Sequence, residues 1–301
     1  MRTITSTSSD AAEPRQSEGP RVDARAGDLP AAGVAPASSG QRQMAAVRRI
    51  MPLGLLVLVI GVWQVLPGVL NVPEFIIPQF SAVVANLLAP AVVTQLISNG
   101  AVTVEESLLG LAIGCASGVL LGLLLGESAT ARGTLYPYIV ALQSLPKVAI
   151  APLFVIWFGF GLTPKILVAV TLTFFPLLVN TMSGVMSVDR DQADLFRALC
   201  CSRRQLWTKL LLPSALPSVF AGLEVATVLA LLGAIVGEFV SAKAGLGLLL
   251  QEQQNNYDTA GMFATLLVLA AIGVFFNQTV VQTRKRVVFW QNSQRDGEDD
   301  Q

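Results

Sequence analysis

The chain has 301 residues, of which 53% are hydrophobic and 13% are charged, and its 20 basic residues balance 20 acidic ones. It has no histidine and three cysteines, at positions 115, 200 and 201, which excludes a histidine-dependent catalytic triad, a histidine-ligated zinc site and a disulfide framework. The low and balanced charge also excludes a basic nucleic-acid-binding protein. We therefore expect no cofactor, no bound metal and no nucleic-acid partner, and the apolar excess predicts a membrane protein.

Residues 1–47 are rich in Ser, Ala, Gly, Pro and Arg and hold few large apolar side chains. Such a segment cannot bury enough apolar surface to offset the entropy lost on ordering. The sequence therefore predicts a disordered tail at the N-terminus.

From residue 50 the chain alternates between long apolar runs and polar connections. A helix needs about 20 apolar residues to cross the hydrocarbon core of a bilayer. Six runs reach about that length: 50–70, 107–126, 137–161, 166–188, 216–240 and 259–281. The sequence predicts an all-α polytopic membrane protein with six transmembrane helices. The alternative, a soluble protein with buried helices, does not account for six such runs.

The basic residues predict the orientation of these helices. With the N-terminus inside, 17 Lys and Arg residues fall in the inside segments 2–49, 132, 190–209 and 284–295, and two, Lys165 and Lys243, fall in outside loops. Cytoplasmic loops carry the excess of Lys and Arg. We therefore expect both termini in the cytoplasm.

The second predicted span carries five glycines at intervals of four residues: Gly110, Gly114, Gly118, Gly122 and Gly126. Small residues at this spacing let two helix backbones approach closely in lipid. Because four residues exceed one helical turn, the stripe winds around the helix by about 40° per step. We expect either a partner that crosses at a steep angle or two partners that share the stripe.

Polar residues inside the later spans are candidates for a translocation pathway. The stretch 143–147 interrupts the third span, where Pro146 frees a backbone carbonyl among polar neighbours. Acidic side chains inside a bilayer normally face a bundle interior or a wet cavity, and hydroxyl groups often bond only to their own helix. The candidates are Gln143, Ser144, Lys147, Thr171, Asn180, Glu224 and Glu238. We consider a pairing of Glu224 with Lys147, and for Glu238 a merely solvated position at the outer interface remains open.

The inside loop 189–217 is long, basic and amphipathic. Five leucines, at 195, 199, 206, 210 and 211, fit one apolar helical face, and Ser202 is placed to cap a short second helix that begins at Arg203. Pro213 and Pro217 mark its end before the next span. Such a loop can lie on the membrane surface or dock into a groove of a soluble partner.

This loop resembles the EAA loop of ATP-binding-cassette (ABC) importer permeases. Aligned on Leu212-Pro213, Asp194 takes the Glu position, Leu195 and Phe196 take the Ala positions, and Cys200 takes the Gly position. Arg197, Ala198 and Ser202 also match the usual choices of the family. The larger side chains at 195, 196 and 200 imply that the contact with the ATPase is looser or differently shaped.

Further matches place the chain close to the nitrate, sulfonate and taurine branch of these permeases. They include Leu142 to Lys147, Trp157 to Gly161, Phe174 to Pro176, and Glu238 followed by Gly245-Leu246-Gly247, within a resemblance that covers about 60–288. Two departures are Glu224 and the pair Glu105-Glu106, where the branch often has a basic residue. The resemblance implies the type I importer permease fold. The implied division is a cytoplasmic tail 1–47, a first helix and external loop 48–96, a transmembrane domain 97–284 and a cytoplasmic tail 285–301.

The resemblance implies a permease subunit in a bacterial inner membrane that is not itself an enzyme. The chain has no GxxxxGK[ST] loop, so the ATP would be hydrolysed by a separate cytoplasmic ATPase dimer that the 189–209 segment contacts. The other implied partners are a periplasmic or lipid-anchored solute-binding protein, a second permease copy and membrane lipid. The solute would be a sulfonate, taurine, nitrate or a related small organic compound.

The alternative is a secondary transporter driven by an ion gradient. That class favours inverted repeats and acidic ion sites at mid-membrane. The sequence shows no clear repeat, and the acidic residues within the predicted spans fall in one helix, the fifth.

Overall fold

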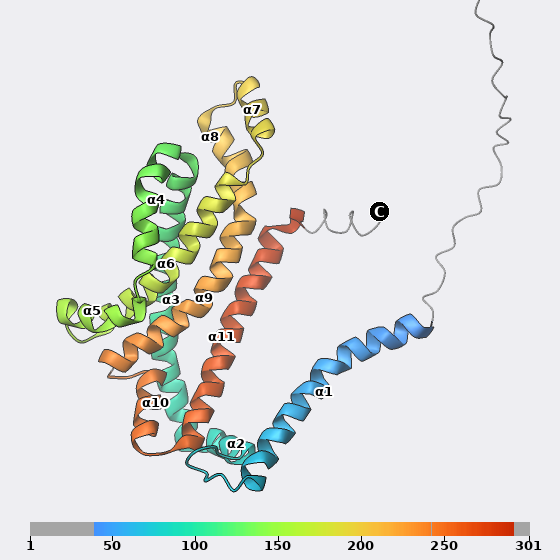
Figure 1. The fold of residues 1–301 in the computed structure, drawn as a ribbon, viewed down its shortest axis with the longest axis vertical. Coiled ribbons are helices and arrows are strands. Elements are labelled where there is room, and N and C mark those ends of the chain that lie inside the picture. Colours follow the sequence, from blue (N-terminus) through green and yellow to red (C-terminus); the bar gives the residue numbers. More distant parts are fainter. Residues whose placement is uncertain (1–38, 242, 292–301) are drawn as a thin grey trace, which may run out of the picture. The chain divides into compact units, whose positions relative to one another are not determined.

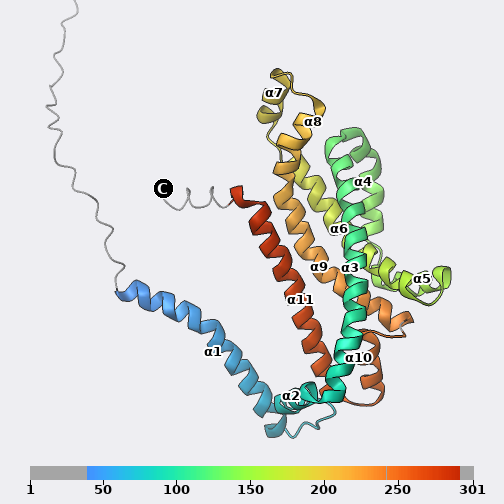
Figure 2. The same cartoon turned by 180° about the vertical axis from the view of Figure 1, so that it is seen from behind.

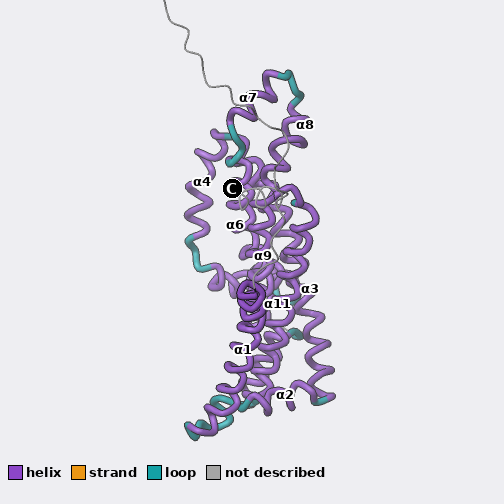
Figure 3. The backbone as a smooth tube through the Cα atoms, turned by 90° about the vertical axis from the view of Figure 1, so that its right-hand side faces the viewer, coloured by secondary structure: helices purple, strands orange, loops and turns teal. Residues whose placement is uncertain are grey.

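The computed structural model describes residues 39–241 and 243–291, and every regular element in them is a helix (Figures 1 and 3). The all-α fold is therefore confirmed. The long helices are α1 (Ser39–Val69), α3 (Pro90–Glu127), α6 (Leu162–Met186), α9 (Leu212–Ser241) and α11 (Thr259–Val287). The short α-helices are α2 (Phe80–Leu88), α4 (Ala129–Gln143), α5 (Ala151–Phe158), α7 (Arg190–Ala198), α8 (Arg203–Leu206) and α10 (Leu246–Asn255). Three further turns are the 3₁₀ helices Lys147–Ile150 and Phe289–Gln291 and the π-helix Trp207–Leu211.

Four helical segments in the described residues are long and apolar enough to cross a membrane: α3, α6, the continuous run Arg203–Ser241, and α11. The segments Ala129–Gln143 and Lys147–Phe158 are bent by 81° and make a fifth crossing if they act as one broken span. The apolar part of α1, Leu53–Val69, is shorter. The protein is thus a multi-pass membrane protein, but the predicted count of six spans is not confirmed. Residues 1–38 of the predicted tail lie outside the described residues, and α1 begins within that predicted tail.

Two spans begin earlier than the sequence predicts. α3 starts at Pro90, a residue favoured in the first turn of a helix, and its 38 residues span about 57 Å. The stretch between the first two predicted spans, 71–106, therefore contains α2 and the first turns of α3. α9 likewise starts at Leu212, so that Pro213 and Pro217 lie inside the helix rather than before it.

The glycine stripe of α3 packs along its whole length against α6. A methyl group added at Gly118 would lie 2.6 Å from the Phe174 carbonyl oxygen, and one at Gly126 would lie 2.6 Å from the Val185 Cβ. The facing residues of α6 also recur every four positions: Ala169, Thr173, Leu177, Thr181 and Val185. The prediction of a steep crossing or two partners was wrong, because two stripes of the same period wind in the same sense and stay in register.

α6 lies between α3 and α9 and contacts both (Figures 1 and 2). On α9, Gly222, Gly233 and Gly237 allow the close approach: an added methyl group would lie 2.8, 2.5 and 2.7 Å from Asn180 Cβ, Ala169 Cα and Lys165 Cα, respectively. Small residues on both sides of α6 therefore hold three helices in one tight core.

The bundle has two distinct ends. Residues 189–206, which we call the α7–α8 arm, extend beyond the core at one end, and α10 and α2 lie at the other (Figures 1 and 2). From Leu56 onward α1 packs near α2 and α11, where the Trp63 ring centroid lies 5.4 Å from those of Phe80 and Phe263.

Candidate functional site

The α7–α8 arm holds most residues of the predicted ATPase-contacting loop. Asp194 and Ala198 are exposed on α7, and Arg197 lies on the same helix with its side chain outside the described part of the structure. Leu195 and Leu199 are 58% and 66% exposed. The prediction of one apolar face was wrong, because α7 ends at Ala198 and a new helix begins at Arg203.

Ser202 caps α8, as the sequence predicts. The Gln205 amide donates to Ser202 Oγ at 3.3 Å, and the Ser202 amide donates to Gln205 Oε1 at 2.8 Å. This reciprocal capping box fixes the start of a helix of only four residues. The arm is therefore ordered by its own local hydrogen bonds.

The backbone conformation of Cys200 produces the turn between α7 and α8. Its φ angle is +52°, in the left-handed region that glycine adopts readily and other residues adopt at a cost. This is the position that aligns with the family's glycine. The backbone thus supplies a physical reason for glycine there, and Cys200 holds the same turn under strain.

The arm continues into the membrane core without a loop. α8 passes through the π-helix Trp207–Leu211 directly into α9, which places Leu212 and Pro213 in the first turn of a core helix. The segment 207–217, predicted as part of the loop, is therefore helical. The arm and α9 therefore form one continuous helical run from Arg203 to Ser241.

The predicted interruption at Pro146 is present. α4 ends at Gln143, Ser144 Oγ donates to the Val140 carbonyl at 3.0 Å, and the second part of the pair leaves at 81°. Lys147 Nζ donates to the Gln143 carbonyl at 3.2 Å and lies 4.9 Å from the centre of the Phe175 ring. Gln143 and Ser144 are exposed and Lys147 is half-buried, so these three candidates lie on the outside of one chain.

The other four pathway candidates lie in separate environments. Thr171 Oγ1 donates to the Leu167 carbonyl, and Asn180 Nδ2 donates to the Pro176 carbonyl, both at 2.8 Å and both within α6. Glu224 forms an ion pair of 2.9 Å with Arg284 in the last turn of α11, so the considered pairing with Lys147 was wrong. A pathway role for these residues stays a prediction.

Glu238 is buried at the α10 end, with 1% of its surface exposed. Its Oε1 accepts from Thr103 Oγ1 at 2.6 Å, and its Oε2 accepts from the Gly247 amide. Thr103 Oγ1 also accepts from the Leu246 amide at 2.8 Å. The N-terminus of α10 is thus capped by side chains of α3 and α9, where the helix dipole favours a carboxylate.

An ion pair between Lys165 and Glu106 lies beside this cap. Both side chains are buried, with 6% and 0% of their surface exposed. The Lys165 ammonium donates to Glu106 Oε1, which joins α6 to α3 at this end of the bundle. Lys165 was expected in an outside loop and Glu106 outside a span. Both expectations were wrong, because each residue finds its counter-charge on a neighbouring core helix.

A signal for this pair was present in the sequence. Glu106 continues the four-residue stripe of α3 glycines by one step, and Lys165 continues the facing stripe of α6 by one step. At two places this chain has an acidic residue where the resemblance leads us to expect a basic one, and each acidic residue forms an ion pair. Glu106 has Lys165 as its partner, and Glu224 has Arg284.

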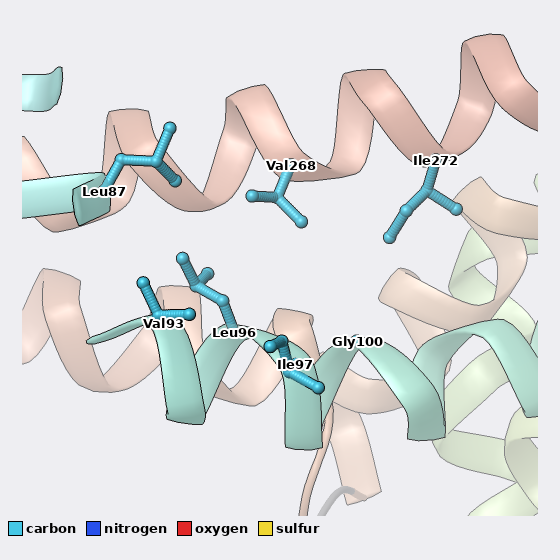
Figure 4. A pocket seen from close by; sticks show the side chains of 7 residues that line it. All are labelled: Leu87, Val93, Leu96, Ile97, Gly100, Val268 and Ile272. Atoms are coloured by element: carbon cyan, nitrogen blue, oxygen red, sulfur yellow. The ribbon is translucent and has the colours of Figure 1, made fainter. Parts of the chain in front are cut away.

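An apolar cavity of about 370 Å³ lies between α2, α3 and α11 (Figure 4). Its walls are formed by Leu87, Val93, Leu96, Ile97, Gly100, Val268 and Ile272. None of these side chains can hydrogen-bond a polar solute, and a solute site needs a few polar groups that fix orientation. We therefore do not place the translocation pathway in this cavity.

Comparison with known proteins assigns the chain to a family. The model for the binding-protein-dependent transport system inner membrane component matches residues 118–287. A probable ABC transporter permease protein of Haemophilus influenzae is 34% identical over 228 residues, which cover 76% of this chain and 92% of that protein. The formylaminopyrimidine transport permease protein ThiX of Halalkalibacterium halodurans is 37% identical, covering 62% of this chain and 74% of that protein. The putative aliphatic sulfonates transport permease protein SsuC of Bacillus subtilis is 28% identical, covering 78% and 85%.

Among solved structures, a chain of the MetNI methionine ABC transporter in an inward-facing conformation superposes with a TM-score of 0.59. The match covers 66% of this chain and 99% of that chain at 18% sequence identity, and it supports the fold alone. The fold, the apolar helices and the family match agree. The chain belongs to the family of binding-protein-dependent transport system inner membrane components and is a multi-pass permease subunit of an ABC importer.

Proposed function

We propose that this subunit moves a small solute through a membrane while a separate ATPase, seated on the α7–α8 arm, hydrolyses ATP. The arm carries this proposal: it is exposed, it is ordered by its own capping box, and it runs as continuous helix into the core. ATP-driven closure of an ATPase dimer would displace the arm and shift the bundle between two discrete arrangements.

The proposed orientation places the arm and both termini in the cytoplasm. The basic residues support it, since the arm and the end of α11 are rich in Arg and Lys. Lys165 is buried in an ion pair and so no longer counts as a residue of an outside loop. Within the described part of the chain, Lys243 is then the one basic residue in the proposed outside loops, and the excess of Lys and Arg on the inside becomes larger. The proposed divisions remain 1–47, 48–96, 97–284 and 285–301.

We further propose that two copies of the chain enclose the pathway. Gln143 and Ser144 are exposed at the break between α4 and α5, and lipid cannot satisfy the backbone groups that a break frees within a spanning segment. A second copy facing this break would cover it and create a polar passage. Lipid would then contact the apolar outer faces of the bundle.

The solute class follows from the relatives, which are named for formylaminopyrimidine and for aliphatic sulfonates. We propose a small organic solute of this kind, delivered by a periplasmic or lipid-anchored binding protein. A thermal-shift screen of that binding protein against sulfonates, taurine, nitrate and pyrimidines tests the class. Stabilisation by none of these compounds rejects it.

The coupling role is tested in proteoliposomes that contain the permease, its cognate ATPase and its binding protein. Deletion of 194–202 should abolish uptake and ATPase association while leaving membrane insertion intact. Uptake that persisted without ATP but collapsed with the ion gradient would favour the secondary transporter. The acidic groups at the α10 end do not favour that alternative, because Glu238 accepts from Thr103 and Gly247 while Lys165 pairs with Glu106.

A further inference from the structure

We propose that the ion pair between Arg203 and Glu127 is a strut through which the arm moves α3. This inference rests on the proposed coupling role of the arm and adds a second route of force transmission. The first route is the covalent one, from α8 through the π-helix into α9. The second would deliver the same displacement to α3, and through α3 to α6.

The geometry of the pair suits this role. Arg203 is the first residue of α8 and Glu127 is the last residue of α3, 76 positions earlier in the chain. Arg203 Nε and Nη2 both donate to Glu127 Oε1, at 3.1 and 2.5 Å. Two donors of a planar guanidinium on one oxygen restrict the direction as well as the distance of the contact.

Both ends of the strut are anchored. The capping box of Ser202 and Gln205 fixes the first turn of α8, where Arg203 sits. At the other end, Arg132 Nη1 donates to the carbonyl oxygens of Leu125 and Gly126, at 3.2 and 3.3 Å, and so holds the last turn of α3. Neither anchor needs the ATPase, so the strut is formed before a partner binds.

The covalent route alone connects the arm to α9 and not to α3. The π-helix Trp207–Leu211 interrupts the regular α-helical hydrogen bonding between arm and core, and such elements are local sites of adjustment. With the strut in place, the arm is attached to α9 and to α3 at the same time. Because α3 and α6 interlock along the glycine stripe, all three core helices would follow the arm as one body.

The strut is expected to matter for transport and little for folding. Arg203 is 80% exposed, and exposed ion pairs contribute little to stability. An ATPase seated on the arm would shield the pair from dissolved ions, and partly buried pairs are screened less by salt than exposed ones. The alternative is that Arg203 contacts the ATPase directly, in which case Glu127 is dispensable.

The test uses the reconstituted permease, ATPase and binding protein, with four variants: Arg203→Glu, Glu127→Arg, the double charge swap, and Arg204→Glu as a matched control. Arg204 is exposed and adjacent to Arg203, and within the described residues it forms no ion pair with Glu127. The readouts are ATPase association and the number of ATP molecules hydrolysed per solute imported.

We expect both single variants to bind the ATPase normally and to raise the ATP cost per solute by at least about fivefold, the lower end of coupling energies between sites. The double swap should restore the ratio to within about twofold, and Arg204→Glu should leave it unchanged. A ratio unchanged in both single variants overturns the strut. Loss of ATPase binding in Arg203→Glu with a normal Glu127→Arg also overturns it, and assigns Arg203 to the ATPase contact. Failure of the wild-type permease to bind the ATPase rejects the proposed function itself.

Discussion

The two ends of the bundle differ in how far their charged and apolar side chains are exposed to solvent. At the α10 end, Glu106, Glu238 and Lys165 are removed from water and held by side chains and amides of the same chain. At the arm end, Arg203, Leu195 and Leu199 are mostly exposed, and the described side chains that order the arm include the capping box of Ser202 and Gln205 and the ion pair of Arg203 with Glu127. The buried charges of the α10 end are therefore satisfied within one chain, whereas the arm end leaves apolar side chains and an ion pair exposed, as the proposed ATPase contact requires.

The largest expected effect is at the α10 end. Lys165→Met removes the cation that pairs with the buried Glu106, and breaking a buried pair by removing one partner costs about 3–5 kcal/mol. The measurement is the free energy of unfolding in mild detergent. Lys243→Met is the matched control, because Lys243 is exposed near the same end, and it should change stability by less than about 0.5 kcal/mol.

A second variant keeps this prediction testable if Lys165→Met does not fold. The double variant Lys165→Met with Glu106→Gln removes both charges of the pair and should recover most of the lost stability. Equal stability of Lys165→Met and the Lys243 control would show that the α10 end does not depend on its buried charges. The contrast between the two ends would then disappear.

A middle-sized effect is expected in the helix pair that joins the two ends. Gly118→Val forces a side chain against the Phe174 carbonyl and should destabilise the protein by about 1–3 kcal/mol. Gly133→Val on α4 is the control, since an added Cβ there meets nothing within 4 Å. If the two variants had the same thermal stability in detergent, α3 and α6 would not form the rigid pair that the strut requires.

The smallest effect, of opposite sign, is expected in the arm. Cys200→Gly relieves left-handed strain of roughly 1–2 kcal/mol, and part of this gain is offset by the greater freedom of glycine in the unfolded chain. We expect a net gain below about 1 kcal/mol, seen as slower amide hydrogen exchange across residues 195–206. Cys201→Gly lacks the strain and should instead speed exchange. Faster exchange in both variants would contradict the account of the turn.

The sequence predicted features that depend on local chemistry. The break at Pro146 and the cap at Ser202 follow from backbone rules that act over a few residues, and both are present. The existence of apolar helices follows from composition. The start of α3 was missed because Glu105 and Glu106 were read as the boundary of an apolar run. The helix continues through both residues, and Glu106 pairs with Lys165.

Features that depend on two distant segments were harder to predict. The partner of the glycine stripe required the matching stripe on α6, and the pairing of Glu224 with Arg284 required the packing of α9 against α11. The single apolar face expected in the arm failed for a local reason: the left-handed turn at Cys200 separates α7 from α8. That turn was signalled by the alignment of Cys200 with a glycine.

The π-helix Trp207–Leu211 has a consequence for how this protein tolerates insertions and deletions. A π-turn amounts to one extra residue within an α-helix, and each residue corresponds to about 100° of rotation about the helix axis. Loss of one residue between Trp207 and Leu211 would therefore shorten the chain only slightly, yet it would turn Arg203 away from Glu127. The rotation of the arm about the helix axis, relative to the core, therefore depends on a single residue. An insertion or deletion in this segment would rotate the arm rather than simply lengthen or shorten the helix.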